Sequence, residues 1–245
     1  MSKPSHIELG DGTRIAILHE DRSVIAIDKP RGWMLVPYSW QKTHRNLQAA
    51  LVSSIAAGQF WARSRGIRFL RHIHRLDADT TGILLLAKSR GALDSLSGLF
   101  ESRHMRKVYL AVTHGEPAET EWTCRARLAP DPRHVGRMRV DARAGKEAET
   151  HFKLLATRAG RSLIEARPVT GRTHQVRLHL TEARLPIVGD ELYDRPASGP
   201  STGKAWLGLR AVELAYDDPF THRAVHVAAP REAFLGRHGF EDYGK

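Results

Sequence analysis

Apolar residues recur along the chain with two periods, and together they predict a fold of short strands and helices. Alternation with a period of two predicts strands at 23–27 and 107–113, and an unbroken apolar run predicts a buried strand at 83–87. Apolar spacings of three and four predict one helix that begins after Asn46 and another that begins after Ser89, because both residues are good N-caps.

The second half of the chain is mostly β in its pattern. Strands are expected at 122–128, 149–156, 162–166, 206–215 and 224–228. The second and third of these form an expected hairpin around Arg158-Ala159-Gly160, and helical spacing covers 172–181 until Pro186 and Gly189 break it. Strands and helices come in mixed order, which predicts an α+β fold with a mixed, mainly antiparallel sheet flanked by helices.

Length and composition narrow the class of protein. The 245 residues suit one catalytic domain over 21–236, with a polar peripheral segment at 1–20 and a tail at 237–245. No apolar run approaches the roughly 18 residues of a membrane span, and no signal peptide is expected at the start. Cys124 is the one cysteine, so a disulfide framework is excluded, and a cytoplasmic location is expected.

The charge of the chain indicates a nucleic-acid partner. Lys and Arg outnumber Asp and Glu by 38 to 27, which gives a formal net charge of +11, and the arginines are spread along the chain. A basic surface on a folded body most often binds nucleic acid, and a merely cationic protein is the alternative interpretation.

The segment HRLDADTTGILLLAK, residues 74–88, carries the main candidate for chemistry. Its polar turn ends at Gly82 and a buried strand follows, so Asp77 is expected in a loop beside a rigid element, where catalytic residues are often carried. Arg71 and Arg75 crowd the same loop, and this positive charge favours the ionised carboxylate.

Three simpler roles compete for Asp77. It could cap the turn, as most loop aspartates do. The letters D-A-D-T-T-G match the start of an EF-hand calcium loop, but Lys88 stands where a glutamate is required. A zinc site of His72, His74 and Asp77 would lack a fourth ligand, and the neighbouring arginines would repel the cation. No metal is therefore expected.

Two further segments concentrate basic residues. The segment 167–180, RPVTGRTHQVRLHL, is expected to open a helix whose amides, with Arg172 and Thr173, suit a phosphate oxygen; a solvated helix face is the alternative. In the strand expected at 107–113, Lys107 and Tyr109 share one face, so the tyrosine is suited to stack on an unpaired base, unless it is simply a core residue.

Five segments, in order, resemble the RluA-type pseudouridine synthases. They are VIAIDKP (24–30), HRLDADTTGILLLAK (74–88), RKVYLA (106–111), PVTGRTHQVRLHL (168–180) and PIVGDELY (186–193). The resemblance spans roughly residues 20–230 and implies an isomerase that converts uridine in ribosomal or transfer RNA to pseudouridine. It implies no redox cofactor, nucleotide or metal, because no electron or group leaves the RNA.

The resemblance also implies roles for single residues. Asp77 matches the family's catalytic aspartate, Tyr109 the tyrosine that stacks on the target base, and Arg177 the arginine that pairs with the aspartate. The target uridine is expected to flip out of its stack, and the aspartate either attacks C1′ or removes a sugar proton. Contacts with RNA are expected from Arg75, Lys107, Arg172, His174, Gln175 and Leu180.

Three departures from the family pattern stand out. Thr81 replaces the usual serine and keeps its hydroxyl, and the loop 31–40 is more aromatic than is usual. The twenty-odd residues before the first matched segment are too few for the S4 RNA-binding domain of many relatives. We therefore expect RNA to be selected by the catalytic domain or by a partner, and we expect a monomer that does not bind DNA.

Two other functions remain open from the sequence. A nucleic-acid hydrolase or N-glycosylase would use Asp77 to cut the strand or to release uracil. A non-catalytic RNA-binding or assembly factor on the same fold would bind RNA without changing it. Loss of tritium from C5 of uridine, with no free uracil and no strand cleavage, distinguishes the isomerase from both.

Overall fold

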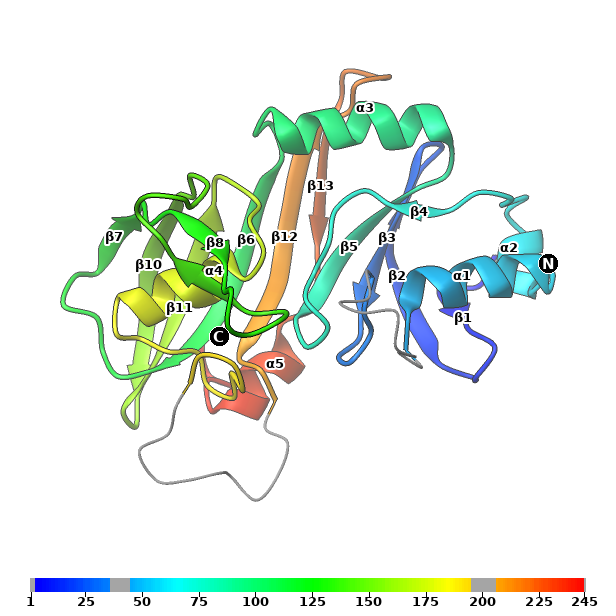
Figure 1. The fold of residues 1–245 in the computed structure, drawn as a ribbon. Helices are drawn as coiled ribbons and strands as arrows, with labels where there is room; N and C mark the ends of the chain where they lie inside the picture. Colours follow the sequence, from blue (N-terminus) through cyan, green and yellow to red (C-terminus); the bar gives the residue numbers. More distant parts are fainter. Residues whose placement is uncertain (1–2, 36–44, 195–205, 245) are drawn as a thin grey trace. The chain divides into compact units, whose positions relative to one another are not determined.

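The computed structural model describes residues 3–35, 45–194 and 206–244, which fall into two compact units (Figure 1). Unit 1 comprises Met1–Met105 and Glu213–Ala229, and unit 2 comprises Arg106–Val212 and Pro230–Lys245. Strand β12 (Leu209–Asp217) contributes its first residues to unit 2 and the others to unit 1. The expected single catalytic domain over 21–236 stays a prediction.

Unit 1 is built on antiparallel strand pairs. Its strands are β1 (His6–Glu8), β2 (Arg14–Glu20), β3 (Val24–Lys29), β4 (Arg71–His72), β5 (Thr81–Ala87), the second part of β12, and β13 (Ala224–Ala228). They are ordered β1-β2-β3-β5-β12, with β4 beside β5 and β13 beside β12. The pairs β1–β2, β2–β3, β3–β5, β4–β5 and β12–β13 run antiparallel.

Two of the three described helices of unit 1 begin where the sequence predicts. The three are α1 (Leu47–Ala56), α2 (Phe60–Arg63) and α3 (Arg90–Glu101). The Asn46 side chain accepts a hydrogen bond from the Ala49 amide at 3.0 Å, and Ser89 accepts one from Ala92 at 3.1 Å. Both predicted N-caps are confirmed, whereas α2, which is only four residues long, was not predicted.

The alternating side chains of β3 separate two apolar cores in unit 1. Ile25 and Ile27 pack in one core with α1 and α2, and Val24 and Ala26 pack in the other with α3. Strand β5 divides its leucines in the same way. Trp33 is buried in the first core, so this part of the aromatic loop 31–40 is packing, while residues 36–40 lie outside the described residues.

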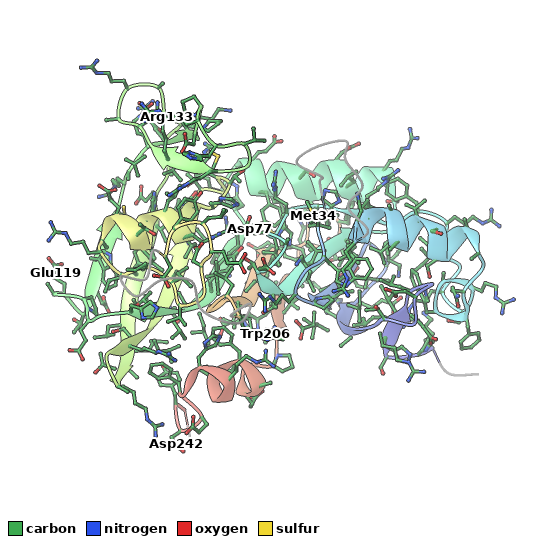
Figure 2. The ribbon with its side chains drawn as sticks, turned by 60° about the horizontal axis from the view of Figure 1, so that its bottom comes forward. Met34, Asp77, Glu119, Arg133, Trp206 and Asp242 are labelled. Atoms are coloured by element: carbon green, nitrogen blue, oxygen red, sulfur yellow. The ribbon has the colours of Figure 1, made fainter. Side chains whose placement is uncertain are left out.

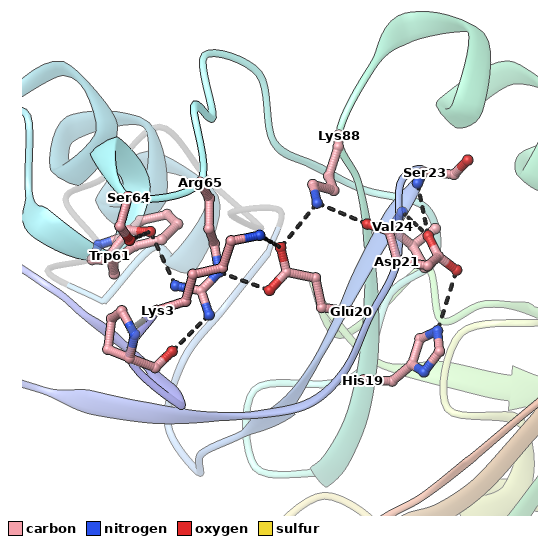
Figure 3. Close-up of polar contacts among 11 residues, drawn as sticks. Lys3, His19, Glu20, Asp21, Ser23, Val24, Trp61, Ser64, Arg65 and Lys88 are labelled. Atoms are coloured by element: carbon pink, nitrogen blue, oxygen red, sulfur yellow. Dashed lines mark hydrogen bonds and ion pairs between the residues drawn. The ribbon is translucent and has the colours of Figure 1, made fainter. Parts of the chain in front are cut away.

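The N-terminal segment 1–20 is not peripheral over its described part, contrary to expectation. Ile7 and Ile15 are fully buried, and β1 and β2 extend the sheet beyond β3. Glu20, at the end of β2, accepts hydrogen bonds from Arg65 Nε at 2.8 Å and Lys88 Nζ at 3.0 Å (Figure 3). These contacts fasten the segment to distant parts of the unit.

Unit 2 carries the β-rich part of the chain. Its strands are β6 (Arg106–His114), β7 (Glu121–Cys124), β8 (Leu128–Pro130), β9 (Met138–Val140), β10 (Thr150–Arg158), β11 (Arg161–Pro168) and the start of β12. They are ordered β12-β6-β11-β10-β7, and β8 and β9 form a separate hairpin. The expected β10–β11 hairpin is confirmed, with left-handed φ of 51° at Ala159 and 71° at Gly160. The strand expected at 122–128 is instead divided between β7 and β8.

Two helices cover the β6 region of unit 2 on opposite faces. Tyr109 packs in the same cluster as residues of α4 (Gln175–Glu182), while Leu110 packs with α5 (Glu232–His238). The predicted alternation of β6 is thereby confirmed. Phe240 is buried beside α5, so the described part of the expected tail at 237–245 is packed against the unit. The α+β class is confirmed, and no described helix is long and apolar enough to span a bilayer.

Candidate active site

Asp77 is half-buried in the loop that connects β4 to β5 in unit 1 (Figure 2). The loop ends where Thr81 begins β5. The apolar residues that follow are buried, and they belong alternately to the two cores of unit 1. Because residues 81–87 form a strand paired with β3, they cannot wrap a calcium ion as the second half of an EF-hand loop would. The calcium interpretation is therefore excluded.

Lys29, at the end of β3, holds the backbone of the Asp77 loop. Its ammonium donates hydrogen bonds to the carbonyl oxygens of Ala78 at 2.8 Å and Thr80 at 3.0 Å, and to that of Pro30 at 3.1 Å. The Gly32 amide donates a second hydrogen bond to the Ala78 carbonyl at 2.8 Å. Ala78 and Thr80, which flank Asp79, are thus fixed by the last residue of β3 and by the segment that follows it.

The same lysine places a buried positive charge near Asp77. Lys29 is fully buried, and burial lowers its pKa to about 8, although the charges of Asp77 and Asp79 act in the opposite direction. Asp79 also pairs with Arg31, whose Nε lies 3.0 Å from the Asp79 carboxylate. The loop therefore holds the Asp79 carboxylate against the fixed Arg31 guanidinium, with the Lys29 ammonium close to both aspartates.

The two histidines of the loop region have structural contacts. His72 Nδ1 lies 2.8 Å from the Gln48 side-chain oxygen, and burial, followed by the charges of Arg71 and Arg75, lowers the His72 pKa. His74 Nε2 accepts a hydrogen bond from the Leu85 amide at 3.0 Å. Among the described residues, no group of three or more His, Cys, Asp and Glu side chains is placed to hold a metal.

Gln175 begins α4 in unit 2 and organises the loop before it. Its side-chain oxygen accepts hydrogen bonds from Thr170 Oγ1 at 2.7 Å and the Arg172 amide at 2.9 Å. Its amide nitrogen donates to the Glu149 carbonyl and to Thr150 Oγ1, both at 2.9 Å. These bonds use both acceptor and both donor positions of the amide. Gln175 therefore has a structural role, and its expected contact with RNA stays a prediction.

The helix expected at 172–181 begins three residues late because His174 has a left-handed φ of 56°. Buried His174 lies with Nδ1 2.7 Å from the Tyr193 hydroxyl, and Leu180 is fully buried in the core. Both side chains are buried, and their expected contacts with RNA stay predictions. Arg172 is exposed, and its Nε donates to the Glu147 carbonyl at 3.0 Å.

Arg177 forms a buried ion pair with Asp190. Its Nε and Nη2 donate to the two carboxylate oxygens, each at 2.7 Å, and only 8% and 1% of the two side chains are exposed. One Asp190 oxygen also accepts from the amides of Leu192 and Tyr193, and the Arg177 guanidinium lies 5.1 Å from the centre of the Tyr193 ring. Sequence reasoning included Asp190 and Tyr193 in the segment 186–193 but gave them no role.

Lys107 connects β6 to the loop before α4. Its ammonium donates to the Thr170 carbonyl at 3.1 Å, and burial lowers its pKa to about 8. Tyr109, two residues further along β6, is half-buried against the core that contains Leu180. Lys107, Tyr109, Arg177 and the start of α4 thus belong to unit 2. Asp77 and exposed Arg75 belong to unit 1.

Residues 23–182 match the family described as RNA pseudouridylate synthase. The chain belongs to this family. Ribosomal large subunit pseudouridine synthase C of Escherichia coli strain K12 is 34% identical over 227 residues, covering 90% of this chain and 68% of the relative. An uncharacterized RNA pseudouridine synthase of Chloroflexus aurantiacus is 42% identical over 144 residues, covering 59% of this chain and 43% of the relative.

Solved structures show that this pseudouridine synthase has the fold of its family. Human RNA pseudouridylate synthase domain containing 4 superposes with a TM-score of 0.69 at 24% identity, covering 91% of this chain and 92% of that one. Human RNA pseudouridylate synthase domain containing 1 gives a TM-score of 0.68 at 24% identity, covering 88% and 83%. Because the chain belongs to the RNA pseudouridylate synthase family, it is an isomerase that acts on RNA. The family match includes Asp77, Tyr109 and Arg177 and ends before Asp190.

Proposed function

We propose that this isomerase makes pseudouridine in ribosomal RNA of the large subunit and that Asp77 is its catalytic residue. The printed names of several relatives at 34% identity support the target. The observation that carries the catalytic assignment is the Asp77 loop itself, which Lys29 and Gly32 fix through the Ala78 carbonyl. A fixed carboxylate loses little freedom when it meets its substrate, and such positioning is a large part of catalysis.

The reaction assigns a step to each proposed catalytic side chain. The target uridine leaves its stack, which costs a few kcal/mol, and Tyr109 replaces the lost stacking. Asp77 then either attacks C1′ and displaces the uracil, or removes a sugar proton as the C1′–N1 bond breaks and a glycal forms. The uracil turns and C5 bonds to C1′; this step breaks the Asp77–C1′ bond in the first route and returns the sugar proton from Asp77 in the second. The proton on C5 then leaves to solvent, and N1 takes up a proton. Atoms balance within the RNA, so we propose no metal or cofactor.

The proposed role of Arg177 is to supply a fixed positive charge. Its predicted pairing with Asp77 comes from the family resemblance and is tested by a double-mutant cycle of Asp77→Asn and Arg177→Met, measured as affinity for RNA. A coupling energy near zero argues against the pairing. We further propose exposed Arg75 and Arg172 as RNA contacts, and a cytoplasmic monomer that does not bind DNA.

The decisive experiment measures tritium release from 5-tritiated RNA. Large-subunit ribosomal RNA, small-subunit ribosomal RNA and transfer RNA are supplied separately, and carbodiimide mapping locates the product. We expect release from the first substrate, none from the Asp77→Asn variant, and normal release from Asp94→Asn, which removes an exposed carboxylate of the same unit. Normal turnover by Asp77→Asn contradicts the catalytic assignment, and release from transfer RNA alone contradicts the target.

A further inference from the structure

The β8–β9 hairpin and its flanks, residues 125–147, form a basic arm that none of the steps above uses. The segment contains seven Arg or Lys residues and three Asp or Glu residues, so it supplies a large share of the chain's net charge of +11. Strands β8 and β9 pair with each other and with no other described strand. The arm is therefore a distinct element of unit 2.

Two of the three acidic residues of the arm stabilise its turns. Asp131 accepts a hydrogen bond from the Arg133 amide at 2.9 Å, and Asp141 accepts from the amides of Arg143 at 3.0 Å and Ala144 at 2.9 Å. These backbone hydrogen bonds lower the pKa of both carboxyl groups. The two aspartates thus shape the arm, and their carboxylates are held by backbone amides.

Three basic side chains of the arm remain available to a partner. Arg133, Arg143 and Lys146 are exposed, and among the described residues no acidic side chain pairs with them. Arg133 lies in the connection between β8 and β9 (Figure 2). Arg143 and Lys146 follow β9, and all three cations are accessible to a ligand of opposite charge.

The arm is held firmly at its base. The Tyr193 hydroxyl accepts a hydrogen bond from the Met138 amide at 2.9 Å, and the Arg137 guanidinium lies 5.3 Å from the centre of the same ring. Arg127 Nε donates to the Gly145 carbonyl at 2.7 Å. A side chain at Gly145 would meet backbone atoms, including the Arg127 carbonyl carbon at 2.7 Å, so the two flanks of the arm are closely packed.

We propose that this arm binds the phosphates of an RNA stem adjoining the target uridine. The proposal rests on the proposed function and names the part of the substrate that the arm takes. Residues 125–147 contain no Phe, Trp or Tyr, so the arm has no aromatic platform for unpaired bases. Exposed cations on a rigid hairpin suit a duplex backbone, which attracts them without reading its sequence.

The test compares two variants with equal loss of charge. The arm variant is Arg133→Gln, Arg143→Gln and Lys146→Gln, and the control is Lys153→Gln, Arg158→Gln and Arg184→Gln, three exposed residues of unit 2 outside the arm. Both are made in the Asp77→Asn background, so that binding is measured without turnover. The probes are a stem-loop transcript of large-subunit ribosomal RNA and single-stranded oligouridine.

We expect the arm variant to bind the stem-loop about tenfold or more weakly, with a logarithmic salt slope lower by about two to three, because each lost phosphate contact lowers it by about 0.7–0.9. The control should change the slope by less than about one. An equal effect of the two variants, or an equal loss on oligouridine and stem-loop, overturns the proposal. If the wild type releases no tritium, the proposed function fails. The role of the arm is still tested by the salt slopes with which the arm variant and the control bind the stem-loop.

Discussion

Arg177 and Asp190 share two hydrogen bonds of 2.7 Å inside unit 2, and both side chains are almost completely buried. The family resemblance implies that Arg177 pairs with Asp77, and it assigns no role to Asp190. Asp190 accepts hydrogen bonds from Nε and Nη2 of this guanidinium group, and the pairing of Arg177 with Asp77 stays a prediction. This bidentate geometry restricts the direction of the arginine more than a single contact could.

Replacing Asp190 should therefore be strongly destabilising. Asp190→Asn removes the carboxylate from a buried arginine, and breaking such a pair costs about 3–5 kcal/mol. Urea unfolding measures the change. The matched control is Glu165→Gln, which removes the carboxylate from Arg167 at the same 2.7 Å separation but leaves an arginine whose side chain is 62% exposed. That change should cost less than about 1 kcal/mol; similar losses for both variants contradict the prediction.

Lys29→Met should impair turnover more than RNA affinity. The substitution keeps the length of the side chain but removes the donor to the Ala78 and Thr80 carbonyls, so the Asp77 loop loses its fixed position. We expect kcat for tritium release to fall at least tenfold while the Kd for RNA changes less than about threefold. Unchanged kcat in a folded variant would show that this lysine does not position the loop.

A comparison of the wild type with Lys29→Met also tests the lowered pKa of Lys29. Its folded pKa of about 8 lies below the ordinary value of 10.5, so the unfolded chain binds more protons between these values. Stability contributed by this group is therefore present above pH 10.5 and lost as the pH falls through 8. The unfolding free energy of the wild type relative to Lys29→Met should rise by about 3 kcal/mol from pH 8 to 10.5. A difference that stays constant with pH contradicts the assignment.

The ion pairs of Glu20 should make the stability of the protein depend on pH in the acid range. Burial raises the pKa of Glu20, but the hydrogen bonds from Arg65 and Lys88 outweigh burial, and the net shift is downward from 4.5 (Figure 3). Its stabilisation is complete above pH 4.5 and is lost as the pH falls through the lowered value. Glu20→Gln should cost about 1–3 kcal/mol at pH 7 and less at pH 3. Glu241→Gln, from an exposed pair with Arg158, should show little change at either pH.

Two glycine substitutions should have opposite signs. Gly145→Ala places a methyl group against the backbone at Asp141 and Arg127, and we expect a loss of about 1–3 kcal/mol. Gly98 lies within α3, and a methyl group there would meet nothing within 4 Å. Gly98→Ala should stabilise the protein by about 0.5–1 kcal/mol. Thermal unfolding of both variants checks the pair, and a stabilising Gly145→Ala contradicts the packing of the arm.

Local patterns predicted the elements whose causes are local. Asn46 and Ser89 were identified as caps because a cap and its helix are adjacent in sequence, and the β10–β11 turn was identified from its own residues. β1 was missed because it has only three residues, and β2 because the segment 1–20 was interpreted as polar and peripheral. The start of α4 was misplaced because a left-handed His174 interrupts the helical spacing.

Residues of the site could be predicted where they belong to a sequence motif. They could not be predicted where their bonding partner is far away along the chain. Asp77 could be placed in a loop before a strand from the letters alone. The bond from Lys29 to Thr80 spans 51 residues, and no periodicity indicates it. The burial of Gln175 and Leu180 could not be predicted either, because a polar or apolar letter does not reveal whether the side chain faces water or a completed core.

The passage of β12 from unit 2 into unit 1 has a consequence for biosynthesis. Unit 1 lacks the end of β12 and all of β13 until residues 213–229 have left the ribosome, and unit 2 lacks α5 until still later. Neither unit can be completed from one continuous stretch of nascent chain. Truncation before β12 therefore leaves both units unfinished and leaves β5 and β6 without their shared neighbour in the sheet, which makes such termination products ready targets for quality-control proteases.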